Sequence, residues 1–294
     1  MLAPKIWKTQ KMYNIVMFAY NEEKNIASSL SSVHLNKGKG LNKFYLIANG
    51  CTDHTVTVAN RVKAQLNFQE LEVINITLGD KCNAWNHYMH QLAENVDCHF
   101  FIDADVNFSN NCFEKMHKRL TETAVETVAI AGMPLSGRNI TFYRSLVIER
   151  SCFFGNLYGL KHSFIQRIKE SDFTLPIGLN WIDSFLTKAV NTDLQFFKYN
   201  LPNRVTYSEG VGYKFSSLSP FHLDDIKLYF NRIARYELGK IQEQYLDEIA
   251  IRNWPNNMQA INLQIRENFQ MHSEKLSTLK KYLVNKRLNK LLKN

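Results

Sequence analysis

The chain has 294 residues, of which 45% are hydrophobic and 21% charged, so it can bury a sizeable core and has neither collagen-like nor low-complexity composition. Its formal net charge of +9 is compatible with nucleic acid, an anionic membrane or a phosphorylated small molecule as partner, and charge alone does not choose among them. Five cysteines without a Cys-x-x-Cys pair argue against a disulfide framework or a zinc ribbon, and no run of 18 uncharged apolar residues predicts a transmembrane helix.

From residue 13 to about 134 the chain repeats one pattern, in which an apolar strand-like run is followed by a polar turn and a stretch of helical periodicity. The strands are expected at 13–18, 43–48, 71–77, 99–102 and 127–131. Helices are expected near 22–33, 52–66, 81–93 and 109–120, with N-caps at Asn21, Asp53, Asp80 and Ser109. Strands that alternate with helices predict right-handed βαβ units and a mostly parallel sheet, and therefore an α/β fold.

After Pro134 this alternation ends. Residues 142–169 read as helical, with small interruptions at Gly155 and Gly159, and a mixed segment that contains three prolines follows. From residue 222 the pattern is helical almost to the end, with a break at 254–255. We therefore expect an α/β domain over 1–220 and a helical C-terminal region over 221–294.

The turns that follow the strands are the first place to look for a site, because ligands of open parallel sheets lie beyond the carboxyl ends of the strands. The fourth strand ends in Asp103-Ala104-Asp105. Carboxylates of this kind suit Mg²⁺ or Mn²⁺, whose coordination is completed by phosphate and water oxygens. A single Asp-x-Asp is more often an ordinary capped turn than a metal site. Acidic residues such as Glu22 are also common in the first turn of a helix, because the helix dipole stabilises negative charge there.

Taken together, the turns resemble those of the family 2 glycosyltransferases, which have the GT-A nucleotide-sugar-binding fold. The family's Pro-x-Tyr-Asn-Glu-like turn is matched by 18–22, and its Asp-Asn-Gly-Ser-Thr-Asp-like turn by 48–53. Its Gly-Lys-x-x-Ala-x-Asn-like helix start is matched by 79–86, with Asp80 as an extra residue, and its Asp-x-Asp metal motif by 103–105. The resemblance covers residues 12–240 and implies a nucleotide-sugar half up to about residue 134 and an acceptor half after it.

The resemblance also implies which residues bind the donor and the metal. Asn49 would face the nucleobase, Lys81 would lie near the base or the diphosphate, and Asp103 would approach the ribose or the phosphates. Asp105 would bind Mn²⁺ or Mg²⁺. The donor-binding positions of this half are Ala19, Tyr20, Asn21, Glu22, Asn49, Lys81, Asp103 and Ala104. Ala48 stands where the family often has Asp. The resemblance therefore does not determine the nucleobase of the donor, although UDP is the commonest carrier in the family.

The acceptor half carries the candidate catalytic base. Residues 154–160 resemble the segment that lines the acceptor cleft, and 175–183 occupy the place of the family's Glu-Asp motif. Inverting transfer needs a base that takes the proton of the acceptor hydroxyl, and Asp183 is the candidate. Ile182 replaces the preceding Glu, and a purely structural role for Asp183 at a helix start remains the alternative.

Residues 232–236, Arg-Ile-Ala-Arg-Tyr, resemble the Gln-x-x-Arg-Trp motif of polysaccharide synthases. On a helix, Arg232 and Arg235 share a face, where two guanidinium groups suit a diphosphate; a solvated basic face is the alternative. His222 stands where some relatives have a further metal ligand, although most such histidines are structural.

The resemblance implies an inverting, metal-dependent enzyme that moves a sugar from a nucleoside diphosphate sugar to a glycan or lipid-linked acceptor, in cell-envelope or capsular glycan synthesis. One alternative is a sugar-phosphate nucleotidyltransferase, which would need a glycine-rich basic loop where residues 20–22 stand. Another is a non-catalytic basic binding protein, but aromatic and basic residues do not interleave in the strands, so we expect no nucleic acid as partner. A third is an inactive chain with the same fold.

The segment 275–294 has seven basic residues and no acidic one. Six leucines recur in it at helical spacing: Leu276, Leu279, Leu283, Leu288, Leu291 and Leu292. A basic amphipathic helix of this kind can lie on an anionic membrane. Since the N-terminus has no apolar run of signal length, we expect a cytoplasmic protein with peripheral contact to the inner face of the membrane. The alternative is that these leucines pack on the protein body.

Overall fold

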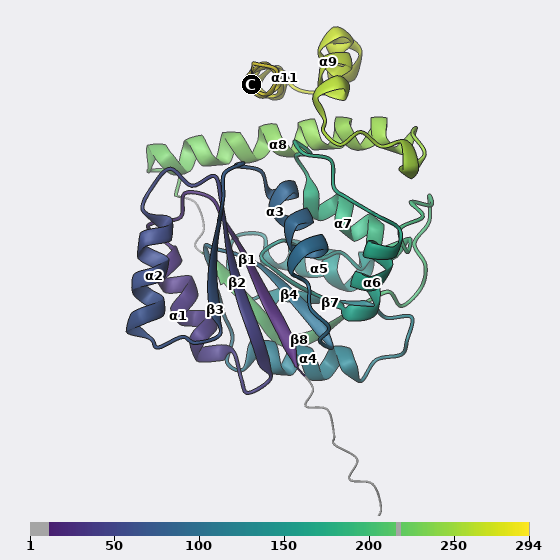
Figure 1. The fold of residues 1–294 in the computed structure, drawn as a ribbon. Helices are drawn as coiled ribbons and strands as arrows, with labels where there is room; N and C mark the ends of the chain where they lie inside the picture. The colour runs from purple at the N-terminus through teal and green to yellow at the C-terminus, as the bar shows by residue number, and fades with distance from the viewer. Residues whose placement is uncertain (1–11, 216–218, 294) are drawn as a thin grey trace, which may run out of the picture.

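The computed structural model describes residues 12–215 and 219–293, in which helices flank an eight-stranded sheet of order β3-β2-β1-β4-β7-β6-β8-β5 (Figure 1). The strands β3, β2, β1 and β4 are mutually parallel, and β6 is parallel to β8, whereas β7 is antiparallel to both β4 and β6. The α/β class with a mostly parallel sheet is therefore confirmed. The strands are β1 (Tyr13–Ala19), β2 (Leu41–Asn49), β3 (Leu71–Ile76), β4 (Cys98–Asp103), β5 (Val106–Phe108), β6 (Ala129–Pro134), β7 (Leu157–Lys161) and β8 (Val205–Phe215).

Both faces of the sheet are buried, which explains why the central strands read as continuous apolar runs. In β1, Ile15 and Met17 join an apolar cluster under α1 (Ile26–Asn36), α2 (Thr55–Gln65) and α4 (Cys112–Thr121). Val16 and Phe18 join a second cluster on the opposite face. There the helices are α3 (Lys81–His87) with a π-helical turn (Tyr88–Leu92), α5 (Ile140–Arg150), α6 (His162–Glu170) and α7 (Ile182–Asn191).

The expected helix over 142–169 is wrong in its middle part. Residues 157–161 form β7, which is inserted between β4 and β6 and pairs with both. Gly159, taken as a helix interruption, lies against the neighbouring strand, because a Cβ there would come 2.7 Å from Cε1 of Phe100. The glycine thus marks a close approach within the sheet.

Of the four expected N-caps, Asp80 is confirmed, since its Oδ1 accepts a hydrogen bond from the backbone N of Asn83 at 3.0 Å. The N-cap position of α2 is His54, one residue after the expected Asp53. Asp53 still accepts a hydrogen bond from the backbone N of Thr55, the first residue of the helix, at 3.0 Å. Asn21 and Ser109 are not caps, because α1 begins only at residue 26 and α4 at residue 112.

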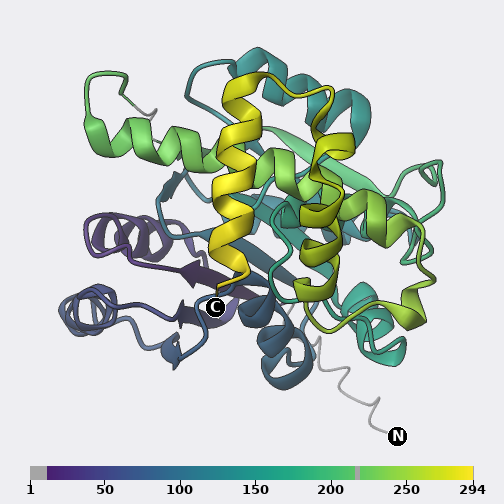
Figure 2. The same ribbon diagram turned by 90° about the horizontal axis from the view of Figure 1, so that it is seen from above.

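The C-terminal helices lie over the carboxyl ends of the parallel strands (Figure 1). The long helix α8 (Leu223–Asp247) crosses this edge, and α11 (Thr278–Leu291) packs across α8 (Figure 2). Between them lie a 3₁₀ turn (Ile251–Asn253), α9 (Gln259–Glu267) and α10 (Phe269–Ser273). Within the described ranges, no helix has the length and apolar character of a membrane span.

Most leucines of the C-terminal segment pack on the protein body, which is the alternative given above to membrane contact. Leu288 is fully buried in the second apolar cluster, and Leu276, Leu291 and Leu292 pack against that cluster, whereas Leu279 is 51% exposed. The helices after residue 220 thus share a core with the preceding domain, and the division at that residue stays a prediction.

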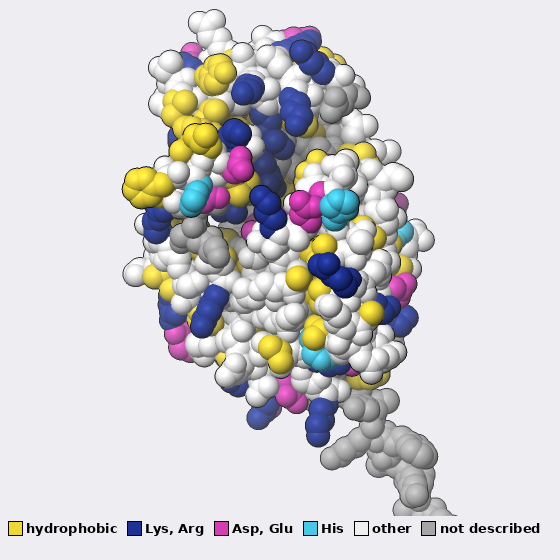
Figure 3. Space-filling model, turned by 90° about the vertical axis from the view of Figure 1, so that its left-hand side faces the viewer, with side chains coloured by type: hydrophobic (Ala, Val, Ile, Leu, Met, Phe, Trp, Pro, Cys, Tyr) yellow, Lys and Arg dark blue, Asp and Glu magenta, His cyan; other side chains and the backbone are white. Residues whose placement is uncertain are grey.

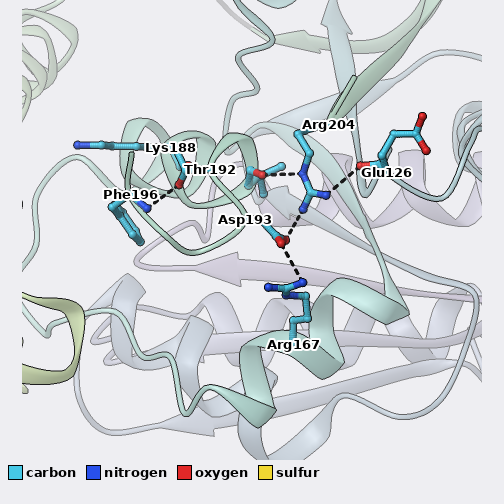
Figure 4. Close-up of polar contacts among 8 residues, drawn as sticks. Glu126, Arg167, Lys188, Thr192, Asp193, Phe196 and Arg204 are labelled. Atoms are coloured by element: carbon cyan, nitrogen blue, oxygen red, sulfur yellow. Dashed lines mark hydrogen bonds and ion pairs between the residues drawn. The ribbon is translucent and has the colours of Figure 1, made fainter. Parts of the chain in front are cut away.

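The far end of α7 is fastened to the sheet by a buried guanidinium group (Figure 4). Arg204, just before β8, binds Asp193 Oδ1 at 2.5 Å and donates to the carbonyls of Val190 and Glu126 at 3.1 Å each. Arg167 on α6 pairs with the other oxygen of Asp193 at 2.8 Å. These contacts fix the helix at whose start the candidate base stands.

Candidate active site

The carboxyl ends of β1 and β4 lie side by side, so the turns singled out in the sequence meet at one edge. Asp103 ends β4, and its Oδ1 lies 2.6 Å from Nζ of Lys81, the first residue of α3. Burial by itself lowers the pKa of Lys81, but the charges of Asp103 and Asp183 outweigh burial and raise it above its usual value. Lys81 is therefore a fixed cation within the site.

Carboxylates are crowded beside this lysine. Burial and the charge of Asp103 raise the pKa of Asp105, although Arg232, whose Nη2 lies 4.0 Å from Asp105 Oδ2, opposes the shift. Burial also raises the pKa of Glu22 to about 7, and the charges of Asp105 and Asp103 contribute to it. Carboxylates that repel one another in this way are what a divalent cation stabilises.

The oxygen donors of Asp103 and Asp105 fit a hard divalent cation that takes its remaining ligands from phosphate and water. Among the described residues, however, no group of three or more His, Cys, Asp or Glu side chains is arranged to hold a metal. His222 is the exposed N-cap position of α8, and the structure does not assemble it with Asp105 into such a group. Its role as a ligand stays a prediction.

The turns after β1 and β2 hold each other in place. Asn49, 4% exposed, donates from Nδ2 to the carbonyl of buried Ala19 at 2.9 Å, and Asn21 Oδ1 accepts from the backbone N of Thr52 at 2.8 Å. Asn21 has a left-handed φ of 55°. Tyr20 is 55% exposed, so its ring remains accessible to a ligand. Contacts of these residues with a nucleobase stay predictions.

Asp183 joins the site across a glycine. A Cβ on Gly155 would lie 2.7 Å from Asp183 Oδ1 and 2.8 Å from Lys81 Nζ, so both charged groups approach the space that this glycine leaves open. Burial raises the pKa of Tyr213, and the charges of Asp183 and Asp103 add to the shift. The structure therefore brings Asp183, Lys81 and Asp103 together.

The arginines of residues 232–236 lie over the same edge. Tyr236 packs on Trp181 with ring centroids 4.2 Å apart, and a Cβ on Gly239 would come 2.4 Å from Trp181 Cβ, so α8 lies directly on the start of α7. From this helix Arg232 approaches Asp105, and the positive charge of Arg235 acts against protonation of Lys81. Ala104, between the two aspartates, is buried.

One residue near this edge was missed by the sequence analysis. Arg287 of α11 is half-buried and donates from Nε to Oδ1 of Asn180, three residues before Asp183. Burial and the charge of Arg235 lower the pKa of Arg287 to about 10. No local signal distinguishes it from the other basic residues of 275–294, because its position depends on how α11 packs.

The fold is shared with solved glycosyltransferases of the GT-A type. A mannosyltransferase of Pyrobaculum calidifontis in complex with GDP-Man and Mn²⁺ is 13% identical, with a TM-score of 0.61 over 98% of this chain and 82% of that one. TarS of S. aureus (residues 1–349) is 15% identical, with a TM-score of 0.53 over 96% and 83% of the two chains. Glucosyl-3-phosphoglycerate synthase of Mycobacterium tuberculosis, in complex with Mn²⁺, UDP and phosphoglyceric acid, is 15% identical, with a TM-score of 0.51 over 77% of each chain.

No curated protein matches the chain significantly. The family model "Glycosyl transferase family 2" matches residues 14–179, which is more than half of the chain and includes the turns after β1, β2 and β4. The resemblance noted in the sequence is thereby confirmed. This chain belongs to glycosyltransferase family 2 and is a glycosyltransferase.

Proposed function

We propose that this glycosyltransferase moves a sugar from a nucleoside diphosphate sugar, UDP-linked, to an acceptor hydroxyl with inversion at the anomeric carbon. The observation that carries the proposal is the convergence of Asp183 and Lys81 at Gly155, with Asp103 bound to Lys81 at the carboxyl edge of the sheet. Proteins with this fold are known in complex with GDP-Man and Mn²⁺ and with UDP and Mn²⁺, which supports the donor class and the metal.

In the proposed mechanism, Asp105 would hold Mn²⁺ or Mg²⁺ and Asp103 would approach the ribose or the phosphates. A bound metal would offset the charge that grows on the leaving diphosphate. Lys81 and the two arginines of α8 add positive charge on the same side. Asp183 accepts the proton of the acceptor hydroxyl as that oxygen attacks the anomeric carbon, and its place in the first turn of α7 fixes its direction. Tyr20 lies accessible at the donor side.

The nucleobase is tested by calorimetry of the wild-type protein with UDP and with GDP, each in the presence of Mn²⁺. We expect UDP to bind more tightly. Binding of GDP alone would replace the UDP assignment with a guanine nucleotide and leave the reaction class intact. Binding of neither nucleotide would remove the donor class itself.

For the acceptor we propose a glycan or a lipid-linked sugar of cell-envelope or capsular synthesis, used on the cytoplasmic side. Since most leucines of α11 pack inward, membrane contact would depend on exposed lysines, Lys286 and Lys290 of α11 and Lys293 just after it. Flotation with vesicles that contain anionic lipid should retain the wild-type chain and lose a variant in which these three lysines are glutamine. Equal flotation of both, or none of either, removes the membrane contact.

A further inference from the structure

Two arginines from the C-terminal region border the segment that precedes Asp183. Arg287 donates to Asn180, and Arg235 is next to Tyr236, whose ring packs on Trp181 with centroids 4.2 Å apart. Arg235 comes from α8 and Arg287 from α11, and the charge of the first disfavours protonation of the second. Two cations from two separate helices therefore lie at the same edge of the site.

The carboxylates nearby are already engaged with other groups. Asp103 binds Lys81 at 2.6 Å, and Asp105 lies 4.0 Å from Arg232. Asp80 favours the charged form of Arg287, but its two oxygens accept from backbone amides, Oδ1 from Asn83 and Oδ2 from Gly178, each at 3.0 Å. Within residues 12–215 and 219–293, neither Arg235 nor Arg287 forms an ion pair with a carboxylate.

The guanidinium group of Arg287 is held in position by a buried amide network. Its Nε donates to Oδ1 of Asn180. The backbone N and Nδ2 of Asn180 donate to Gln242 Oε1 at 2.9 and 3.1 Å, and Gln242 Nε2 donates to Asn262 Oδ1 at 2.8 Å. Asn180, Gln242 and Asn262 are all buried. Because this network uses the Nε–H, the two terminal nitrogens of Arg287 keep the fork geometry that binds oxyanions.

Lys and Arg side chains gather in a hollow between the C-terminal helices and the body of the molecule, on the face drawn in Figure 3. Two cations held near each other, one of them fixed by neutral partners, destabilise the protein when no anion is bound. A bound anion removes this cost. The arrangement is therefore that of a preorganised anion site.

We propose that Arg287 and Arg235 together bind a phosphate group of the substrate, so that the C-terminal helix α11 completes the active site. The phosphate belongs either to the diphosphate of the donor or to a phosphorylated acceptor, and the fork of Arg287 suits both. The assignment to a substrate rests on the proposed function, whereas the anion site itself does not.

The test is calorimetry of the wild-type protein, Arg287→Gln and Arg266→Gln with three probes: UDP with Mn²⁺, inorganic pyrophosphate and inorganic phosphate. The glutamine of Arg287→Gln can still donate to Asn180 but has no charge, and we expect this variant to bind at least one probe more weakly by about tenfold or more. Arg266→Gln makes the same substitution at an exposed position of α9 and should bind every probe as the wild type does. Arg287→Lys keeps the charge but loses the fork and should fall between the two.

The pattern of losses distinguishes the two sources. Weaker binding of UDP and pyrophosphate assigns the group to the donor diphosphate, whereas weaker binding of inorganic phosphate with unchanged UDP affinity assigns it to the acceptor. If Arg287 has only a structural role, Arg287→Gln should have a lower melting temperature than the wild type. If Arg287 belongs to an anion site, the variant loses the repulsion with Arg235, and its melting temperature should be unchanged or higher.

Unchanged affinity of Arg287→Gln for all three probes overturns the proposal, and so does a fall in affinity that only parallels a fall in melting temperature. If the wild type and Arg287→Gln bind all three probes equally, this inference fails while the proposed function stands. If pyrophosphate binding depends on Arg287 but no nucleotide binds, the anion site stands while the proposed donor fails.

Discussion

At the scale of single residues, the proposed mechanism depends most on Asp183, the proposed base. Asp183→Asn keeps the shape of the side chain but cannot accept a proton at neutral pH, so we expect kcat to fall by roughly 10² or more. The affinity for the donor should change little. Steady-state kinetics and UDP calorimetry on the same preparation measure both quantities.

The matched control is Asp172→Asn, an exposed carboxylate in a left-handed turn that asparagine also tolerates. It should leave both quantities unchanged. A loss of donor affinity in Asp183→Asn that parallels its loss of rate would show that Asp183 is structural and that another group is the base.

Asp105→Asn tests the metal assignment. A neutral amide is a poorer ligand for a hard cation, so Mn²⁺-dependent binding of UDP should weaken by at least about tenfold, and turnover should fall with it. Binding of UDP in Mn²⁺ and in EDTA, for the wild type and the variant, provides the measurement. Full activity of the wild type in EDTA would contradict a metal at this position.

Residues whose placement depends on the local chain were predictable from the sequence. Asp80 caps α3, and Asp103 ends a buried strand, because both follow from a strand, a turn and a helix start that are adjacent in sequence. Arg287 was not predictable, because Asn180 lies 107 residues away and meets it only after α11 has packed on α8. Its neighbourhood is a product of tertiary packing.

At the scale of elements, the packing of α11 accounts for the apolar pattern of the C-terminal segment. Leu288→Ala should lower the free energy of unfolding by about 2–4 kcal/mol, because a fully buried leucine leaves a cavity. Leu279→Ala, at a leucine that is 51% exposed on the same helix, should change it by less than about 0.5 kcal/mol. Urea denaturation compares the two. Equal effects would show that α11 does not pack through Leu288.

The contact between α7 and α8 should make stability depend on pH. Burial raises the pKa of Glu243 on α8 from 4.5 to about 7, so the folded chain holds this proton more tightly than the unfolded chain does. The resulting stabilisation is complete below about pH 4.5 and is lost as the pH rises through about 7.

Glu243→Gln removes this dependence. Relative to the wild type, the variant should gain on the order of 1–3 kcal/mol of unfolding free energy between pH 4.5 and pH 8, with little difference at the acidic end. Glu248→Gln, at an exposed position near the end of the same helix, is the control and should follow the wild type. A difference between Glu243→Gln and wild type that stays constant with pH would contradict a raised pKa.

Most elements up to residue 134 were predictable because each of the longer strands alternates with its own helix, and the hydrophobic period changes at every turn. The three-residue strand β5 was not predicted, because it is short and follows β4 without a helix between them. β7 was not, because its five residues lie between two helices and contain the glycine that the sheet requires for close approach. Its antiparallel place between β4 and β6 depends on strands distant in sequence.

At the scale of the whole molecule, the C-terminal helices complete the carboxyl edge of the sheet. The parallel half contains Lys81 and the two aspartates, the acceptor half contains Asp183, and α8 and α11 contain the arginines. These two helices lie above the sheet in Figure 1. The sequence predicted the first two contributions, and Arg232 and Arg235 of α8, through local motifs. The contribution of Arg287 requires the docking of α11, which the sequence marks only as amphipathic and basic.

The central claim is that this edge binds a nucleoside diphosphate sugar with a divalent metal and breaks its bond to the sugar. The most direct measurement is the release of nucleoside diphosphate from a panel of UDP-sugars and GDP-mannose, in Mn²⁺ and in EDTA, by the wild type and by Asp105→Asn. We expect release from at least one UDP-sugar that requires Mn²⁺ and is largely lost in the variant. Release that is equal in Mn²⁺ and EDTA, or no release from any donor in the panel, would contradict the account.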